Sequence, residues 1–170
     1  MHKKLFLPLL CIFLTSTLSA NVVEVAGYRF TAPDSWEQTK PSSSMRKAQL
    51  KIAGEDGQQA ELVFFYFGPS GGGGVRANVD RWLKQFENML DQSVKEEIVH
   101  DVKTTFVRIW GTFLSGSPFG PKTPKSGYSL SGAIIEGKNG AIFLKMVGHS
   151  KVVDQNHDAL ISLISKALEK

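Results

Sequence analysis

The sequence predicts an α+β domain with a mostly antiparallel sheet and helices packed on it. Short runs rich in β-branched and aromatic residues follow one another through turns that contain glycine, which is typical of neighbouring antiparallel strands. Two segments show apolar residues at helical spacing, one in the middle of the chain and one at its end. Helices separated by runs of strands indicate the α+β class.

Residues 1–20 have the features of a secretory signal peptide. Lys3 and Lys4 precede an apolar run, and small residues end the segment at Ala20. The apolar run is ten residues long, whereas a membrane span needs about 20. We therefore expect cleavage after Ala20, a secreted or periplasmic protein, and no stable membrane anchor after cleavage.

Residues 21–170 are predicted to form a single domain, because their length suits one hydrophobic core. The only cysteine, Cys11, lies in the signal segment, so the mature chain forms no internal disulfide. Residues 1–20 contain two of the 20 basic residues and none of the 16 acidic ones, which leaves a formal charge of +2. No basic run exceeds Arg46-Lys47, so we predict no nucleic-acid partner.

The strands are predicted from alternation and residue type. Residues 47–52 alternate apolar and polar side chains, as in a strand with one solvent face, and residues 61–67 are apolar on both faces, as in a central strand. Residues 33–36 predict a turn that buries the indole of Trp36. Tight hairpins are predicted at residues 54–57 and 137–140. The other predicted strands are residues 22–25, 28–31, 94–99, 106–114, 128–136 and 141–147.

Two amphipathic helices and one long loop complete the prediction. Val75, Val79, Trp82 and Phe86 recur at helical spacing and predict a helix over residues 75–91. A closing helix is predicted over residues 151–168, with Ser150 as its N-cap. Residues 115–127 contain three prolines and predict a surface loop rather than a strand interior.

The segment YRFTAPDSW, residues 28–36, and the order of the elements together resemble the PsbP-like fold family. That family includes the photosystem II extrinsic subunit PsbP, a nuclear transport factor that binds the Ran GTPase, and DcrB-type bacterial envelope proteins. The resemblance implies an α/β/α sandwich and a small non-catalytic binding or assembly subunit. Residues 42–47, 67–68 and 78–86 are also similar to uncharacterised secreted proteins of environmental bacteria.

Four consecutive glycines at positions 71–74 precede the first predicted helix and suggest an anion site. Free backbone N–H groups and the helix dipole both favour an anion at such a place. The ligand-binding residues under this hypothesis are Gly72, Gly73, Gly74 and Arg76. The alternative, which we favour, is a permissive connection between a buried strand and a helix.

Nucleotide motifs fit this turn poorly. Gly68 and Gly73 have the spacing of a phosphate-binding P-loop, but glycine and valine follow where that motif needs lysine and then serine or threonine. A looser dinucleotide pattern is present at residues 72–77, but it functions in a parallel βαβ unit, and the neighbouring strands are predicted to be antiparallel. We predict no cofactor.

Asn78, Arg81 and Gln85 lie together beside the apolar stripe of the first predicted helix. They are interpreted either as boundary residues that hydrogen-bond loop backbone or as a polar binding ledge; we favour the first, because polar groups at a buried edge need partners. In the long loop, Phe119 with Lys122 and Lys125 forms either a partner-binding surface or part of a mobile tether.

The histidines give no catalytic or metal site. His157 faces the apolar side of the closing helix and is interpreted as a satisfied core or edge residue. No Ser/His/Asp arrangement is visible in the sequence, and His100 and His149 have no metal-ligand spacing. We predict no catalytic residue and no metal.

The leading hypothesis is a secreted or periplasmic, non-enzymatic domain that binds a protein or an envelope component. The alternative is a small-molecule or anion-binding protein, or a weak hydrolase, that uses the turn at residues 71–74. Converging polar groups with perturbed titration in a concave site would favour the alternative, and a flat surface would favour the first.

Overall fold

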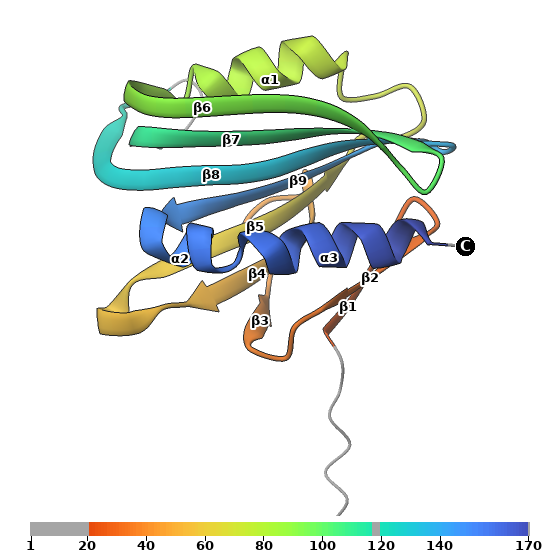
Figure 1. Cartoon of the computed structure of the whole chain (residues 1–170), viewed down its shortest axis with the longest axis horizontal. Helices are drawn as coiled ribbons and strands as arrows, with labels where there is room; N and C mark the ends of the chain where they lie inside the picture. The colour runs from red at the N-terminus through yellow and green to blue at the C-terminus, as the bar shows by residue number, and fades with distance from the viewer. Residues whose placement is uncertain (1–20, 117–119, 170) are drawn as a thin grey trace, which may run out of the picture.

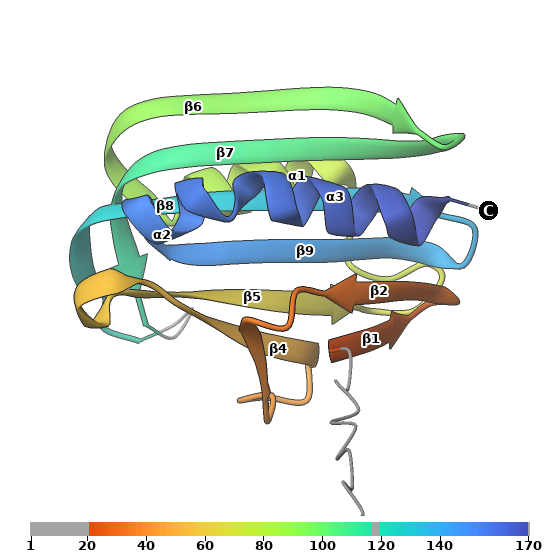
Figure 2. The same cartoon turned by 60° about the horizontal axis from the view of Figure 1, so that its bottom comes forward.

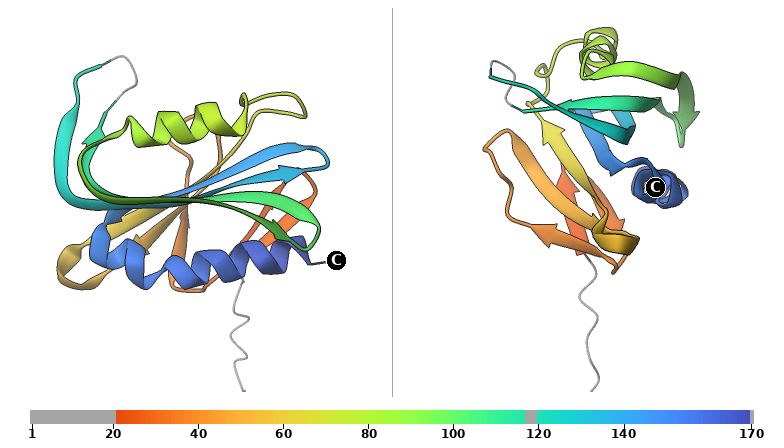
Figure 3. Two further views of the ribbon diagram at one scale, coloured as in Figure 1. Left: turned by 45° about the horizontal axis from the view of Figure 1, so that its top comes forward. Right: turned by 90° about the vertical axis from the view of Figure 1, so that its left-hand side faces the viewer.

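The computed structural model describes residues 21–116 and 120–169, and these form an α+β domain, as predicted. Seven strands form one antiparallel sheet in the order β3-β4-β5-β9-β8-β7-β6. Helix α1 lies on one face of this sheet and helices α2 and α3 lie on the other, which gives three layers (Figure 3). The strands are β3 (Trp36–Thr39), β4 (Arg46–Ala53), β5 (Gln59–Tyr66), β6 (Phe86–Val99), β7 (Val102–Ser115), β8 (Thr123–Gly137) and β9 (Gly140–His149).

Strands β1 (Asn21–Val25) and β2 (Tyr28–Ala32) form a separate two-stranded ribbon. The ribbon lies against α3, beside the sheet end that carries β4 (Figures 1 and 2). The helices are α1 (Val75–Leu83), α2 (Ser150–Gln155) and α3 (His157–Leu168). No helix within the described ranges has the length and hydropathy of a membrane span.

The sheet separates two hydrophobic cores. The larger core packs the ribbon, α2 and α3 against β4, β5, β8 and β9, and contains the fully buried Phe30, Leu50 and Leu62. The smaller core packs Val79 and Trp82 of α1 against β7, β8 and β9. Side chains along a strand alternate between these two faces, so each central strand contributes to both cores.

The predicted turn before Trp36 and the predicted strands of the first half are confirmed. Trp36 is 1% exposed, its N–H donates to the carbonyl oxygen of Pro33 at 3.0 Å, and its Nε1 donates to Asn156 Oδ1 at 2.9 Å. In β4, Ala48, Leu50 and Ile52 are buried as the alternation predicted. Strand β5 lies between β4 and β9, which makes it a central strand.

The prediction of a helix over residues 75–91 was wrong at its second half. Helix α1 ends at Leu83, and the chain continues as β6, which pairs with β7 from Phe86 onward. Phe86 is buried from the strand, where its ring lies 5.3 Å from that of Phe113. The apolar spacing therefore continued past the end of the helix by coincidence, and long-range strand pairing overrode it.

The closing helix is also different from the prediction. It is divided into α2 and α3 at Asn156, whose side-chain Nδ2 donates to the carbonyl oxygen of Val152 at 2.8 Å. The N-cap position is His149 and not Ser150, and the Ser150 hydroxyl donates instead to the carbonyl oxygen of Gly127 at 3.0 Å.

The predicted loop over residues 115–127 is shorter than expected, because β7 extends to Ser115 and β8 begins at Thr123. Pro124 lies opposite Leu114 of β7, and β9 pairs with β8 only from Tyr128 onward. This part of β8 is therefore locally an edge, and a proline is tolerated there because no second strand needs its missing N–H.

Candidate functional site

Lys145 lies on the α1 face of the central strand β9. Its neighbours in the sheet are Val63 of β5 and Gly132 of β8. Leu144 and Met146 on either side belong to the larger core, so alternation turns the Lys145 side chain to the opposite face. A lysine is thus partly buried in the middle of a seven-stranded sheet, where an apolar residue is usual.

The surroundings of Lys145 disfavour its charge. Burial lowers the pKa of Lys145 from 10.5 to about 8; the nearby Arg46 cation lowers the pKa further, and the carboxylate of Glu61 opposes the change. Its Nζ donates to Oε1 of Gln85, a neutral amide, and lies 5.4 Å from the centre of the Phe113 ring. A cation is therefore held on this face by one neutral acceptor and one ring.

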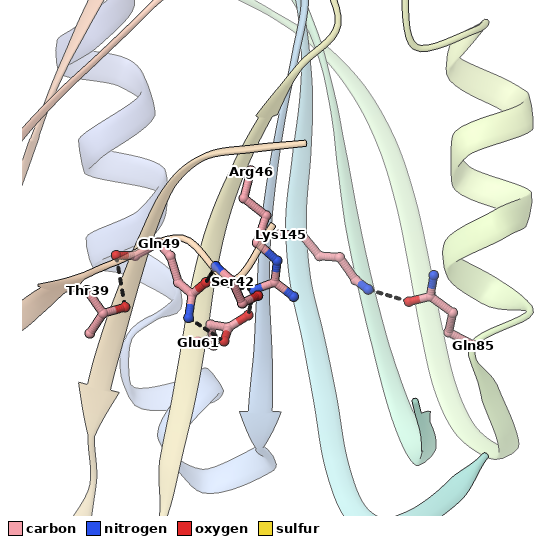
Figure 4. A network of polar contacts seen from close by, with 7 residues as sticks. All are labelled: Thr39, Ser42, Arg46, Gln49, Glu61, Gln85 and Lys145. Atoms are coloured by element: carbon pink, nitrogen blue, oxygen red, sulfur yellow. Dashed lines mark hydrogen bonds and ion pairs between the residues drawn. The ribbon is translucent and has the colours of Figure 1, made fainter. Parts of the chain in front are cut away.

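Arg46, Gln49 and Glu61 form the polar surface beside Lys145 (Figure 4). The Arg46 guanidinium forms an ion pair with Glu61 and donates to Gln49 Oε1 at 3.0 Å, while Gln49 Nε2 donates to Glu61 Oε2 at 3.0 Å. Gln49 and Glu61 alternate with core residues of β4 and β5, so both lie on the same face as Lys145. We call Lys145, Arg46, Gln49, Glu61 and Gln85 the Lys145 cluster.

Helix α1 bounds this cluster on one side through Trp82 and Gly132. A methyl group at Gly132 would lie 2.8 Å from the Trp82 ring and 2.9 Å from the carbonyl oxygen of Leu144. The glycine therefore allows the indole to contact the sheet directly beside Lys145. Gln85 follows at the turn after α1, where its N–H donates to the carbonyl oxygen of Trp82 at 3.1 Å.

A row of rings continues from the cluster across the same face. Phe113 stacks with Tyr128 at 6.3 Å between ring centres, and Tyr128 lies 4.8 Å from the ring of His149. All three rings are partly exposed. The face therefore combines two cations and one carboxylate with an adjacent aromatic surface.

Comparisons with known proteins agree with this fold. No protein-family model matches the chain, and no curated protein matches it in sequence. The solution structure of cyanobacterial PsbP (CyanoP) from Synechocystis sp. PCC 6803 matches with a TM-score of 0.51, 10% sequence identity, and coverage of 82% of this chain and 85% of that chain. The fold is PsbP-like. PA94 from Pseudomonas aeruginosa, a protein of unknown function, covers 86% of this chain and 94% of its own at a TM-score of 0.46 and 12% identity.

Within this PsbP-like fold, the glycine turn has a structural explanation. A methyl group at Gly71 would lie 1.9 Å from the carbonyl oxygen of Phe67, and one at Gly72 would lie 2.7 Å from the Phe143 ring. Gly72 and Gly73 also have φ of +88° and +75°, which favours glycine. Gly74 is the N-cap of α1, and Arg76 is exposed in its first turn. Anion binding at this turn stays a prediction.

Asn78 and Arg81 form the hydrogen bonds expected of boundary residues. Asn78 is 3% exposed, and its Nδ2 donates to the carbonyl oxygens of Gly72 at 2.7 Å and Gly74 at 3.0 Å. Arg81 Nη1 donates to Asn78 Oδ1 at 2.6 Å. Gln85, which the sequence placed beside this pair, accepts a hydrogen bond from Lys145 and belongs to the Lys145 cluster instead. A ligand-binding role for Asn78 and Arg81 stays a prediction.

The predicted partner-binding residues of the long loop fall only partly within the described ranges. Phe119 lies outside the described residues. Lys122 is exposed just before β8, and Lys125 lies within β8 with its Nζ 5.5 Å from the centre of the Tyr128 ring. A partner-binding role for this segment stays a prediction.

A second polar group lies beneath the junction of α2 and α3. His157 Nδ1 and Ser131 Oγ are 2.9 Å apart, and Asp154 binds Arg108 at 2.6 Å and the Trp110 indole N–H at 3.1 Å. Burial lowers the pKa of His157, the Arg108 cation lowers it further, and the carboxylates of Asp158 and Asp154 oppose the change. His157 is thus a satisfied edge residue, as the sequence suggested.

Sequence reasoning missed the Lys145 cluster. Its members come from four separate segments of the chain. Lys145 is a single polar residue in an otherwise apolar strand, and this pattern indicates a buried lysine only weakly when the neighbouring strands are unknown. A lysine flanked by residues that the pattern places in the core, in FLKMV, was the one available indication.

Proposed function

We propose that the chain is an exported, non-enzymatic binding domain that holds an anionic group of an envelope component at the Lys145 cluster. The observation that carries this proposal is the placement of two cations, Lys145 and Arg46, on one face with Glu61 as the single carboxylate of the cluster. An anion between them would stabilise the charged form of Lys145, whose present acceptor is the neutral Gln85.

The chemistry of the ligand follows from the neighbouring rings. Phe113, Tyr128 and His149 are partly exposed beside Lys145 and offer an apolar surface to whatever carries the anion. A phosphate or carboxylate attached to an apolar body fits such a face better than a free inorganic ion. An amphipathic envelope component has this combination.

Two further observations support a non-enzymatic role. The Ser131 hydroxyl that contacts His157 belongs to a residue only 1% exposed, so a substrate cannot approach it. Asp154, the nearest candidate for a third member of a catalytic group, is already bound to Arg108 and Trp110.

Export and an envelope ligand are supported by the sequence. Residues 1–20 have the pattern of a cleavable signal peptide. Residues 28–36 resemble the PsbP-like fold family, and the DcrB-type envelope proteins in that family are consistent with the same compartment. Expression of the full chain in a bacterial host and intact-mass measurement of the product test this step, since cleavage after Ala20 predicts a mature N-terminus at Asn21.

Binding is tested by titrating the protein with dodecyl phosphate below its micellar concentration and following the backbone amide resonances of Lys145 and Gln85. Dodecyl maltoside supplies the neutral amphiphile, and inorganic phosphate supplies the anion without the apolar body. We expect saturable shifts with dodecyl phosphate, weaker shifts with inorganic phosphate, and none with the maltoside.

The matched variants are Lys145→Met and Lys151→Met. Lys151 lies on α2, across the sheet, and pairs with Glu55, so its removal leaves the Lys145 cluster intact. We expect Lys145→Met to weaken dodecyl phosphate binding by roughly tenfold or more, about 1.4 kcal/mol, and Lys151→Met to leave it unchanged. Equal binding by the two variants would contradict the proposal.

A further inference from the structure

Strand β6 is the long open edge of the sheet. It pairs with β7 on one side, and Figures 1 and 2 show it at the margin of the sheet, with no strand of the described residues beyond it. The opposite edge, β3, is four residues long, whereas β6 has 14. An open edge presents unpaired backbone N–H and C=O groups, and a long one is a template for another strand.

Exposed apolar side chains lie along β6 on one face. Val94 lies opposite Val107 of the smaller core, so it is on the α1 face, and Ile98 is on the same face four residues later. Val94 is 46% exposed and Ile98 is 70% exposed. Lys95 and Glu97 lie on the opposite face of the strand.

We propose that β6 pairs with β6 of a second copy of this chain, antiparallel, about a two-fold axis at Glu96. In this register Val94 lies opposite the partner's Ile98, and Lys95 lies opposite the partner's Glu97. Each relation occurs twice by symmetry, which gives two apolar pairs on one face and two ion pairs on the other.

The axis also places Glu96 opposite the partner's Glu96. Lys103 of β7 already lies 3.2 Å from the Glu96 carboxylate, so each chain supplies a cation to this pair. The neighbouring registers lack such compensation. An axis at Lys95 places that lysine opposite itself and Val94 opposite Glu96, and an axis at Glu97 places Ile98 opposite Glu96.

The proposal is independent of the ligand at the Lys145 cluster. It is tested first by sedimentation equilibrium of the purified protein from about 1 μM to about 500 μM, a range that covers micromolar dissociation constants. We expect a concentration-dependent dimer. A monomer at every concentration would overturn the proposal, whatever the protein binds elsewhere.

A charge exchange tests the register. Lys95→Glu places a second carboxylate opposite the partner's Glu97 and is expected to weaken the dimer by at least roughly tenfold. Adding Glu97→Lys restores opposite charges in the inverted order and is expected to restore the dimer. Both side chains are exposed, so thermal unfolding of each variant serves as the control for folding.

A cysteine scan tests the position of the axis. Directly opposite residues in an antiparallel pair have Cβ atoms about 5 Å apart, whereas diagonal neighbours lie about 7–8 Å apart. A direct disulfide, formed by mild oxidation without a spacer, therefore joins Glu96→Cys chains efficiently only if the axis passes at that residue. We expect covalent dimers with Glu96→Cys and far fewer with Gln92→Cys or Lys95→Cys. Equal cross-linking at all three positions, or failure of the exchanged double variant to dimerise, would overturn the register.

Discussion

The side-chain amide of Asn78 closes the glycine turn, since its Nδ2 donates to the carbonyl oxygen of Gly72 at 2.7 Å and to that of Gly74 at 3.0 Å. The backbone N–H of Asn78 also donates to the Gly74 carbonyl oxygen, at 3.2 Å. The residue is almost fully buried, so these donors take the place of water at the turn. The turn is thus held from within the helix that follows it.

Replacing Asn78 by alanine or aspartate should therefore destabilise the domain. Neither side chain can donate to the turn, and an unsatisfied buried carbonyl costs about 1–3 kcal/mol. Urea unfolding measures this change. Arg81→Ala, which removes only the exposed outer member of the chain of hydrogen bonds, should cost less than about 1 kcal/mol. A larger loss for Arg81→Ala than for Asn78→Ala would contradict this assignment.

Gly132→Ala should be strongly destabilising. The added methyl group meets the Trp82 ring at 2.8 Å and the carbonyl oxygen of Leu144 at 2.9 Å, and backbone cannot move aside cheaply. Overpacking of this kind costs about 1–3 kcal/mol. Because Trp82 must move, tryptophan fluorescence should change as well.

Gly74→Ala is the matched control for Gly132→Ala. A methyl group at Gly74 meets nothing within 4 Å, and the residue has a φ of −70° that alanine adopts readily. Its unfolding free energy should stay within about 1 kcal/mol of the unmodified protein. If both glycines tolerated alanine equally, the contact between Trp82 and the sheet would not be required.

Lys145→Met should stabilise the protein at neutral pH, and the gain should shrink in alkali. The folded pKa of Lys145, about 8, lies below its unfolded value of 10.5, so the unfolded chain binds more protons between these values. The stability of the unmodified protein therefore rises with pH across this window relative to the variant. The full effect is of order 3 kcal/mol. Urea unfolding at pH 7, 8.5 and 10 measures it, and a pH-independent difference would contradict the assignment.

The free energy of unfolding should decrease at acid pH because His157 is neutral in the folded protein. The pKa of His157 is lower in the folded protein than in the unfolded chain. Its contribution to the free energy of unfolding is therefore fully present above the unfolded pKa and is lost as the pH falls through the folded pKa. The charged groups facing it are Arg108, Asp154 and Asp158. His157→Gln should lose less stability than the unmodified protein between pH 7 and pH 5, as measured by thermal unfolding. Identical losses would count against a neutral histidine at this site.

Local patterns in the sequence predicted the fold class and most strands. The alternation in β4 and the uniform apolarity of β5 report their burial directly, and the buried Trp36 follows from the turn that precedes it. Where the outcome depended on distant partners, the prediction was wrong. Residues after Leu83 carry a helical spacing but pair with β7, and Pro124 enters a strand because β9 does not reach it.

The candidate site could not be predicted from the sequence, because it too depends on contacts between distant segments. Lys145, Arg46 and Gln85 are brought together by strand order and by the end of α1, and neither could be inferred from spacing along the chain. The glycine turn is visible in the sequence because its residues are contiguous. In the structure, packing against Phe67 and Phe143 accounts for Gly71 and Gly72.

Helix α1 is only nine residues long, and helices of that length have little stability in isolation. Its hold on the sheet rests on Val79 and on the indole of Trp82 above Gly132, directly beside Lys145. Amide hydrogen exchange should therefore be faster in α1 than in the central strands. We therefore expect one wall of the Lys145 cluster to open without unfolding of the larger core, at a free-energy cost that depends on the contacts of Val79 and Trp82 with the sheet.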